Sequence, residues 1–473
     1  MTGTKLLPGQ SDLPSKDSTA SYWHKEPSRL LLGHRTTPDL PVQTDIVVIG
    51  SGITGAFAAR ELVRGGRQVL MLEAREACWG ATGRNGGHCQ PMLYLTEPHV
   101  GRFELDTFNL ISTLIQENSI PCSWEMTGGV HSITSHEVLS LVSRRIEQLR
   151  ISHPDLARRV HLITDREELR RLRLRDDHAV AAVVQDCAAK CWPYKLVCWV
   201  LERLLLEEPA GTFNLQTQTP VVHLQRRDRG WIVHAERGQV VASHVVLATN
   251  AYTSRLLPEL TRMINPVRGQ VCALSPPEGS TPLQHTHVWM VQEEGDAGES
   301  DDYLVQRPSG ELIFGGERMC VADGGEGVSR DDQIDSRVGT RLRAALHSTL
   351  QLSRSDPRTL EAEYEWTGIM GYSVDGNPWV GRVPEGLGGG ADGVAGDGPG
   401  GLWVSAGYTG HGMPVAARCG IAVAERILGK MKGTVQVPPE WEITESRVQC
   451  SAENSLKLPQ TLEEELRVLV GDC

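Results

Sequence analysis

A glycine-rich turn between two apolar stretches is the feature that most constrains how this chain can fold. Residues 45–49 read Asp-Ile-Val-Val-Ile and run directly into Gly50, Gly52 and Gly55. An alanine-rich segment with helical spacing follows, and then a second apolar stretch, 69–72, which is followed at once by an acidic residue. This order of strand, turn, helix and strand is typical of a βαβ unit that holds a dinucleotide.

Each position of this unit has a separate physical role. Gly50 permits the tight turn, Gly52 lets a pyrophosphate approach the backbone, and Gly55 lets the helix lie close to the strand. The acid Glu73 follows Gly50 by about 20 positions, the spacing of the carboxylate that accepts ribose hydroxyls. An acid at this position disfavours a 2′-phosphate, so NADP is not expected. The alternative is a glycine-rich turn in an unrelated sheet, which the second strand and the acid disfavour.

Composition narrows the class of protein further. The chain has 473 residues, 40% of them hydrophobic, which predicts a globular protein of two or three folding units. Its net charge of −12 argues against a nucleic-acid partner. We find no apolar run of about 18 residues that would predict a membrane helix, and no secretory segment in the first twenty residues. The eleven cysteines contain no CxxC pair, and we expect reduced thiols in a cytoplasmic protein.

A second glycine-rich block indicates which dinucleotide binds. Residues 78–88 read Cys-Trp-Gly-Ala-Thr-Gly-Arg-Asn-Gly-Gly-His. Backbone this poor in side chains does not suit a core helix, but it can lie flat against a large planar ligand. With this block the chain resembles the D-amino-acid-oxidase-like (DAO) superfamily of FAD-dependent amine oxidoreductases, and within it the gamma-glutamylputrescine oxidase and glycine oxidase-like branch.

The resemblance extends in the correct order over roughly residues 45 to 430. The further matching segments are 247–251, 266–270, 314–317, 366–368, 375–378 and 407–413. It implies FAD as the cofactor and an α/β fold, with a doubly wound Rossmann-type FAD-binding domain and a second, mostly antiparallel sheet as the substrate domain.

We expect the chain to pass between these two domains several times. The expected order is a surface-lying N-terminal arm (1–43), FAD-binding segments (44–125, 201–263, 361–433) that alternate with substrate-domain segments (126–200, 264–360), and a C-terminal extension (434–473). Ser135 is expected to cap a helix, Pro193 to open one, and 462–470 to form a short amphipathic helix. The segment 386–401, nearly all Gly, Ala, Asp and Val, is expected to be a flexible loop.

The motifs also predict the cofactor site. The expected FAD-binding residues are Gly50, Ser51, Gly52, Ile53, Thr54, Gly55, Glu73, Ala74, Gly80, Ala81, Thr82, Arg84, Asn85, Gly86, Gly87, His88, Val222, Ala248, Thr249, Asn250, Gly407, Gly410, His411, Gly412 and Met413. The last four lie where a strand ends before a helix, so their N–H groups can stabilise negative charge at the flavin pyrimidine edge; the alternative is an ordinary strand-to-helix turn. We expect non-covalent FAD, although His88 or Cys89 could in principle carry a covalent link.

The resemblance implies oxidation of a C–N bond in a small amine, amino acid or alkaloid-like metabolite. The amine must be neutral to react, and an apolar, aromatic pocket favours that form. The aromatic candidates are Tyr252, Trp289, Trp366, Tyr372 and Tyr408, any of which can instead be a core residue. We name His411, Tyr252, Trp366 and Tyr372 as catalytic candidates, and His411 can equally be structural. Arg268 and Arg318 can bind a carboxylate or form salt bridges, and no residues suggest a metal site.

The electron acceptor and the reaction remain open at this point. Molecular oxygen is a candidate acceptor, but the lysine that sarcosine-oxidase relatives place over the flavin falls near Ile313, with no lysine close by. The small-molecule substrate is not identified by the sequence. Two alternatives are a flavin oxidoreductase that acts on a C–OH or C–C bond in secondary-metabolite biosynthesis, and a non-catalytic flavin-binding scaffold.

Overall fold

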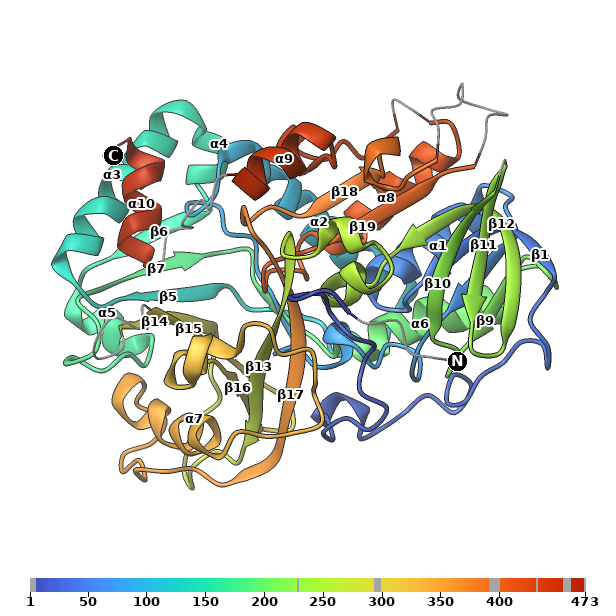
Figure 1. Ribbon diagram of the computed structural model, residues 1–473. Coiled ribbons are helices and arrows are strands. Elements are labelled where there is room, and N and C mark those ends of the chain that lie inside the picture. The colour runs from blue at the N-terminus through green and yellow to red at the C-terminus, as the bar shows by residue number, and fades with distance from the viewer. Residues whose placement is uncertain are drawn as a thin grey trace.

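A computed structural model describes residues 6–227, 229–292, 299–390, 400–430, 433–453 and 461–471. Its framework consists of two large sheets, one in the right half and one in the left half of the view in Figure 1. The chain crosses between them repeatedly, as expected for this α/β class. The fold prediction is therefore confirmed.

The first sheet has the order β10-β11-β12-β1-β2-β9, with β19 paired to β12 and β18 to β19. Its parallel strands are β1 (Gln43–Ile49), β2 (Val69–Leu72), β9 (Phe213–Gln216), β12 (Gly238–Leu247) and β19 (Leu402–Ala406). Its antiparallel members are β10 (Val221–Arg227), β11 (Gly230–Ala235) and β18 (Trp379–Arg382). The central strands read as continuous apolar runs because both of their faces are buried. Helix α1 (Ile53–Arg64) packs against α6 (Pro193–Leu206) and α8 (Ala416–Ile427).

The second sheet has the order β17-β13-β16-β15-β14-β5-β7-β6 and is antiparallel except for the pair β14–β5. Its strands are β5 (Gly129–Ile133), β6 (Val160–Ile163), β7 (Ala181–Gln185), β13 (Ile264–Leu274), β14 (Thr286–Gln292), β15 (Glu299–Gln306), β16 (Leu312–Gly315) and β17 (Ala362–Ser373). Three short strands form a separate small sheet: β3 (His88–Cys89), β4 (Glu125–Met126) and β8 (Ala189–Lys190). The remaining α-helices are α2 (Pro98–Asn118), α3 (His136–Ser152), α4 (Pro154–Ala157), α5 (Arg166–Arg171), α7 (Ser336–Thr349), α9 (Glu445–Glu453) and α10 (Leu462–Val470).

Several helix boundaries follow from capping. Ser135 accepts a hydrogen bond from the Val138 amide at the start of α3, and Thr461 accepts one from the Glu464 amide at the start of α10. Such a cap satisfies an amide that has no partner within the helix. Pro193 opens α6, where its fixed φ suits the first turn. The predicted cap, the proline start and the short C-terminal helix are confirmed.

Two expected domain boundaries differ from the observed fold. Residues 361–433 were expected in the FAD-binding domain, but β17 pairs along its length with β13 and so belongs to the second sheet. The boundary between 200 and 201 falls inside α6, which packs against α1 as a unit. Of the expected flexible loop 386–401, residues 391–399 lie outside the described residues.

The N-terminal arm does not lie on the surface throughout, contrary to our expectation. The side chains of Tyr22 and Trp23 are 1% and 0% exposed, and the Nε1–H of Trp192 donates to the carbonyl of Trp23 at 2.7 Å. The reason is the apolar area of the two aromatic rings, whose removal from water favours burial. The arm is therefore part of the core beside the 80–88 block.

Candidate active site

A cavity of about 1180 Å³ is lined by both sheets. The first sheet contributes the carboxyl ends of its parallel strands, including Ile49, Leu72 and Ala248. The second contributes Val271 and Tyr303 among others. A typical small-ligand pocket has roughly 300–1,000 Å³, so this cavity can hold a dinucleotide and a substrate together. Its position beyond the carboxyl ends of parallel strands is where ligands bind in open α/β sheets.

The glycine turn after β1 is shaped by contacts with the main chain. Gly50 has φ +102°, and a Cβ added there would lie 2.5 Å from the carbonyl oxygen of Ala248. A Cβ on Gly55 would lie 2.0 Å from the carbonyl oxygen of Gly50. Helix α1 begins with Gly52 at its N-cap, which has no side chain to cap it, and the Ile53 amide donates to Thr82 Oγ1 at 3.2 Å. The first-turn amides after Ile53 lie at the cavity edge, the arrangement that binds a pyrophosphate.

Glu73 is held in position at the end of β2. Its Oε2 accepts hydrogen bonds from the amide and the hydroxyl of Ser51, at 3.0 and 2.6 Å, and its Oε1 accepts one from the Arg75 amide at 2.9 Å. The residue is 9% exposed and lines the cavity. A carboxylate fixed here, beside the glycine turn, fits the ribose of a dinucleotide.

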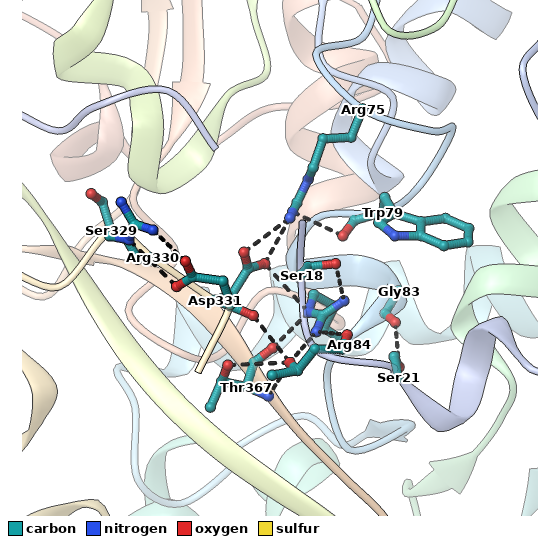
Figure 2. Close-up of polar contacts among 12 residues, drawn as sticks. Ser18, Ser21, Arg75, Trp79, Gly83, Arg84, Ser329, Arg330, Asp331 and Thr367 are labelled. Carbon is teal, nitrogen blue, oxygen red and sulfur yellow. Dashed lines mark hydrogen bonds and ion pairs between the residues drawn. The ribbon is translucent and has the colours of Figure 1, made fainter. Parts of the chain in front are cut away.

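The 80–88 block is held by a buried ionic network, shown in Figure 2. The Asp331 carboxylate lies 2.9 Å from Nη1 of Arg75 and 3.4 Å from Nε of Arg84. Arg84 also donates to the carbonyl of Thr367 and to both the carbonyl and the hydroxyl of Thr19. Burial lowers the pKa of Arg84 to about 10, although Asp331 opposes this shift. The guanidinium of Arg84 thus connects the block to the arm and to β17.

The arm also binds the main chain of this block. Ser21 Oγ donates to the Gly83 carbonyl at 2.9 Å, and the Trp23 indole N–H donates to the Asn85 carbonyl at 2.5 Å. Farther along the arm, Leu13 and Pro14 line the cavity directly. The arm is therefore a component of the site.

The turn between β19 and α8 forms another wall of the cavity. Tyr408 Oη lies 2.8 Å from Ser405 Oγ and 2.8 Å from Thr54 Oγ1, which connects this turn to α1. Gly410 has φ +77°, and a Cβ there would lie 3.2 Å from Tyr372 Oη. In the part of the chain that the structure describes, the amides of Gly412 and Met413 make no hydrogen bond. They are suited to a ligand that carries negative charge.

Two side-chain pairs flank this turn. His411 Nε2 lies 3.3 Å from Oε1 of Glu104, which is 2% exposed. On the other side the Arg318 guanidinium lies over the ring of Tyr372, 5.3 Å from its centroid. The contacts of Arg318 among the described residues are the Tyr372 ring and the Gly324 carbonyl, so the expected alternative of a salt bridge is not observed for it. Arg268 does not line the cavity.

Most of the predicted site residues line this one cavity. They are Gly50, Ser51, Gly52, Ile53, Thr54, Glu73, Ala74, Gly80, Ala81, Thr82, Arg84, Asn85, Gly86, His88, Ala248, Thr249, Asn250, Tyr252, Tyr372, Gly410, His411, Gly412 and Met413. Trp289 and Tyr408, the other aromatic candidates, line it as well. The predicted residues that do not line it are Gly55, Gly87, Val222, Trp366 and Gly407.

The five predicted residues that do not line the cavity are kept from it for different reasons. Val221 lines the cavity and Val222 does not, because successive strand residues point to opposite faces. Trp366 is fully buried and its indole N–H donates to the Arg84 carbonyl at 2.7 Å. Gly407 packs on Trp379. Gly55 is closely packed beneath the Gly50 carbonyl, and Gly87 is closely packed against the Trp23 ring.

Several residues that line the cavity could not be predicted from any motif. From the arm these are Leu13 and Pro14, and from the C-terminal extension they are Trp441, Thr461 and Leu462. Polar examples are Arg75, Gln90, Glu104 and His131. They come from segments outside every motif, and only the fold brings them to one place.

The C-terminal extension is anchored where Arg145 and Gln148 of α3 donate to carbonyls of α10.

The described residues contain no group of His, Cys, Asp and Glu side chains that could hold a metal ion. Among the helices in the described ranges, none has the length and apolarity needed to cross a membrane.

The fold and the site together define a two-domain, flavin-dependent oxidoreductase. The family model described as FAD dependent oxidoreductase (DAO) matches residues 45–426. The chain belongs to this family, it is an enzyme of the oxidoreductase class, and its cofactor is FAD.

Relatives and solved structures agree with this assignment. A probable oxidoreductase OrdL from Rhizobium meliloti is 25% identical, over 84% of this chain and 87% of that protein. The gamma-glutamylputrescine oxidoreductase of Escherichia coli is 22% identical, over 82% and 84%. The crystal structure of glycine oxidase from Geobacillus kaustophilus superposes with a TM-score of 0.68 at 20% identity, over 86% of this chain and 99% of that one. L-amino acid deaminase from Proteus vulgaris gives 0.67 at 16% identity, over 88% and 100%. These structural similarities show the fold.

Proposed function

We propose that this protein oxidises a C–N bond of a small amine, amino acid or alkaloid-like metabolite. The observation that carries the proposal is the cavity of about 1180 Å³, large enough for a dinucleotide and a small substrate, whose lining at the Gly410 turn includes His411 and, from β17 of the second sheet, Tyr372. The names of relatives support it, since they include a gamma-glutamylputrescine oxidoreductase and glycine oxidases.

The residues at the cavity edge fit FAD. Gly50 and Gly52 leave room for the pyrophosphate, Glu73 suits the ribose, and the amides of Gly412 and Met413 suit the electron-rich end of the flavin. When bound, FAD supplies a two-electron acceptor for the hydride of the carbon that bears nitrogen. We propose non-covalent binding: Cys89 is buried outside the cavity lining, and release of all flavin on acid denaturation tests this.

His411 and Glu104 are proposed to manage the proton of the substrate amine. An amine enters mainly as its ammonium form and must lose a proton before it reacts. Removal from water lowers the pKa of an amine, and the His411 imidazole, supported by the Glu104 carboxylate 3.3 Å away, is placed to accept that proton. Tyr372 and Arg318 form the opposite wall, where an amino-acid carboxylate can bind.

Two catalytic candidates are better explained as positioning residues. Tyr252 donates to the Ser329 carbonyl at 3.3 Å, and burial raises the pKa of its hydroxyl, chiefly by desolvation and further by Asp331. It therefore stays protonated beside the ionic network. Trp366 acts on the site through its hydrogen bond to the Arg84 carbonyl.

The purified holoprotein tests the function. Under anaerobic conditions it is mixed with amines, amino acids and hydroxy acids, and loss of the flavin's visible absorbance is followed. Bleaching by an amine supports the proposal, whereas bleaching by hydroxy acids alone supports oxidation of a C–OH bond. Bleaching by no substrate, with chemical reduction still possible, supports a non-catalytic scaffold.

The electron acceptor is a separate question. No lysine lines the cavity in the described ranges, and Ile313 is buried in β16 away from it. The missing lysine argues against molecular oxygen as the acceptor and favours a dehydrogenase that passes electrons to another acceptor. Admitting air to photoreduced protein and measuring flavin reoxidation and hydrogen peroxide distinguishes the two. We also propose a cytoplasmic location without a nucleic-acid partner, consistent with the acidic charge and with cysteines such as Cys78 that form no disulfide.

A further inference from the structure

One part of the cavity lining, close to His411, is apolar, and we call it the apolar end. The cavity residues that define it are Met92, Leu95, Val100, Trp441 and Leu462. The first two belong to the loop after β3, the third to the first turn of α2, and the last two to the C-terminal extension. None of the five is among the predicted FAD-binding residues, so the cofactor does not account for them.

Hydrogen bonds tie the loop of the apolar end to His411. Glu104 Oε2 accepts from the Met92 amide at 2.7 Å, and Glu104 Oε1 lies 3.3 Å from His411 Nε2. Val100 precedes Glu104 by one helical turn, so both side chains lie on the same face of α2. The Thr96 hydroxyl donates to the Met92 carbonyl at 2.8 Å and so closes the loop. The apolar end therefore adjoins the pair that we propose to accept the proton of the substrate amine.

Helix α10 of the extension is fixed to the same loop. The Arg145 side chain, 6% exposed, donates to the carbonyls of Tyr94 and Thr96 at 3.1 and 2.7 Å. It also donates to the carbonyl of Leu469 in the last turn of α10, at 3.4 Å, where a cation is favourable. In Figure 1 α10 lies along α3, against which it packs. The start of α10, at Leu462, is thereby held at the cavity.

The extension is also the part of the site that lies outside the family match. The family model ends at residue 426, so Trp441 and Leu462 come after it. The Trp441 ring packs edge-on against the Phe103 ring of α2, with the centroids 5.0 Å apart. A wall of the cavity close to His411 is thus built from a segment that the family model does not include.

The apolar end offers nothing to a charged group. Met92, Leu95 and Val100 are half-buried, so they keep accessible apolar surface where they line the cavity. The carboxylate of Glu104 is 2% exposed, and its oxygens are engaged by the Met92 amide and by His411. A charged group placed here would lose water without gaining a partner, whereas an apolar group gains free energy on burial.

We infer that the apolar end is a substrate subsite for an alkyl or aryl group carried by the amine that is oxidised, and that Leu462 of the extension helps to determine this specificity. The inference rests on the proposed function. An amine whose nitrogen lies at His411 can place its substituent against Met92 and Val100, because both adjoin the Glu104–His411 pair. The enzyme then prefers amines with long apolar substituents over short amines and over diamines of the same length.

Binding and turnover of matched ligands test this inference in the intact holoenzyme. The ligands are n-alkylamines of increasing chain length and α,ω-diamines of the same lengths. Binding is read from the perturbation of the flavin spectrum, which needs no turnover, and turnover is read from anaerobic bleaching. We expect the Kd of the alkylamines to fall about fourfold with each added methylene until the subsite is filled. Each long diamine should bind at least about tenfold more weakly than the alkylamine of equal length, because its second ammonium loses water.

Substitution of Leu462 should change this preference. Leu462→Asp places a carboxylate at the apolar end, and the first position of α10 suits an acid. The tenfold preference for the alkylamine should fall to unity or reverse. The control is Val468→Asp, which puts the same acid on the same helix at a residue that is 57% exposed and does not line the cavity. It should leave the preference unchanged.

A milder variant covers a failure of Leu462→Asp to fold. Leu462→Ala should weaken the longest alkylamine at least about fourfold and leave the shortest unchanged, since only the long chain reaches residue 462.

The two proposals fail in distinguishable ways. Equal binding of short and long alkylamines, diamines that bind as tightly as alkylamines, or a preference that the Leu462 variants leave intact would overturn the subsite, whatever bleaches the flavin. If the order of binding holds but no amine bleaches the flavin, the proposed reaction is wrong and the subsite stands.

Discussion

Gly50 and Gly66 show how two glycines with similar backbone conformation differ in importance. Both have positive φ, +102° and +78°, so alanine introduces left-handed strain of about 1–2 kcal/mol at either position. At Gly66 the new Cβ meets nothing within 4 Å, whereas at Gly50 it lies 2.5 Å from the Ala248 carbonyl. We expect Gly66→Ala to keep its FAD and Gly50→Ala to lose at least about tenfold in FAD affinity. Flavin content and FAD titration measure this, and equal affinities would contradict it.

His287 predicts a pH dependence of stability. It is 1% exposed, and burial lowers its pKa to about 3, from 6.5. Because the unfolded chain binds this proton more readily, the stabilising effect is full above pH 6.5 and is lost as pH falls toward the folded pKa. Between about pH 5.5 and 4, His287→Asn should reduce the slope of unfolding free energy against pH by about 1.4 kcal/mol per unit. Denaturant unfolding measures it; curves that stay parallel throughout that window would disprove the assignment.

The site residues that could be predicted from the sequence are those whose role depends on backbone conformation within one short stretch of chain. The glycine turn and Glu73 were found because their spacing is set by a strand, a turn and a helix that are adjacent in the chain. Gln90, Glu104 and His131 were not found, because their proximity depends on how a loop, a helix and a sheet pack. Val222 is an intermediate case. The strand that contains it was predicted correctly, but which of Val221 and Val222 points into the cavity depends on which face of the sheet borders the cavity.

Among the elements, the N-terminal arm was the least predictable. Its polar, proline-containing sequence favours a surface location, yet Trp23 is fully buried against the 80–88 block. Trp23→Ala should destabilise the protein by about 3–5 kcal/mol and release FAD, since the block loses its packing and its hydrogen bond at Asn85. Urea unfolding and flavin retention measure both effects. Lys16→Ala, an exposed change in the same arm, should stay within about 0.5 kcal/mol; a Trp23 variant that behaves like it would refute the role of the arm.

The element β17 shows why domain boundaries were harder to predict than strands. The motif 366–368 within it and the motif 375–378 just after it were recognised in the correct order, but pairing partners are not encoded locally. In the structure β17 pairs with β13, and Trp366 and Thr367 on it reach across to Arg84. A strand of the second sheet therefore supports the cofactor block of the first domain.

At the scale of the whole molecule, the cavity spans both sheets, so a ligand that fills it should stabilise both together. The residues that fit the ADP part, such as Gly50 and Glu73, lie at the edge of the first sheet, whereas Tyr372 of the second sheet lies beside the Gly410 turn, where the flavin would bind. A ligand present at a hundred times its Kd raises the free energy of unfolding by about 2.7 kcal/mol. At one fixed concentration, the ligand with the lower Kd raises it more. Added to apoprotein at equal concentration, FAD should therefore raise the Tm well above ADP or riboflavin, and NAD should have little effect. If ADP matched FAD, the flavin would contribute no binding energy, and the second sheet would not cover it as proposed.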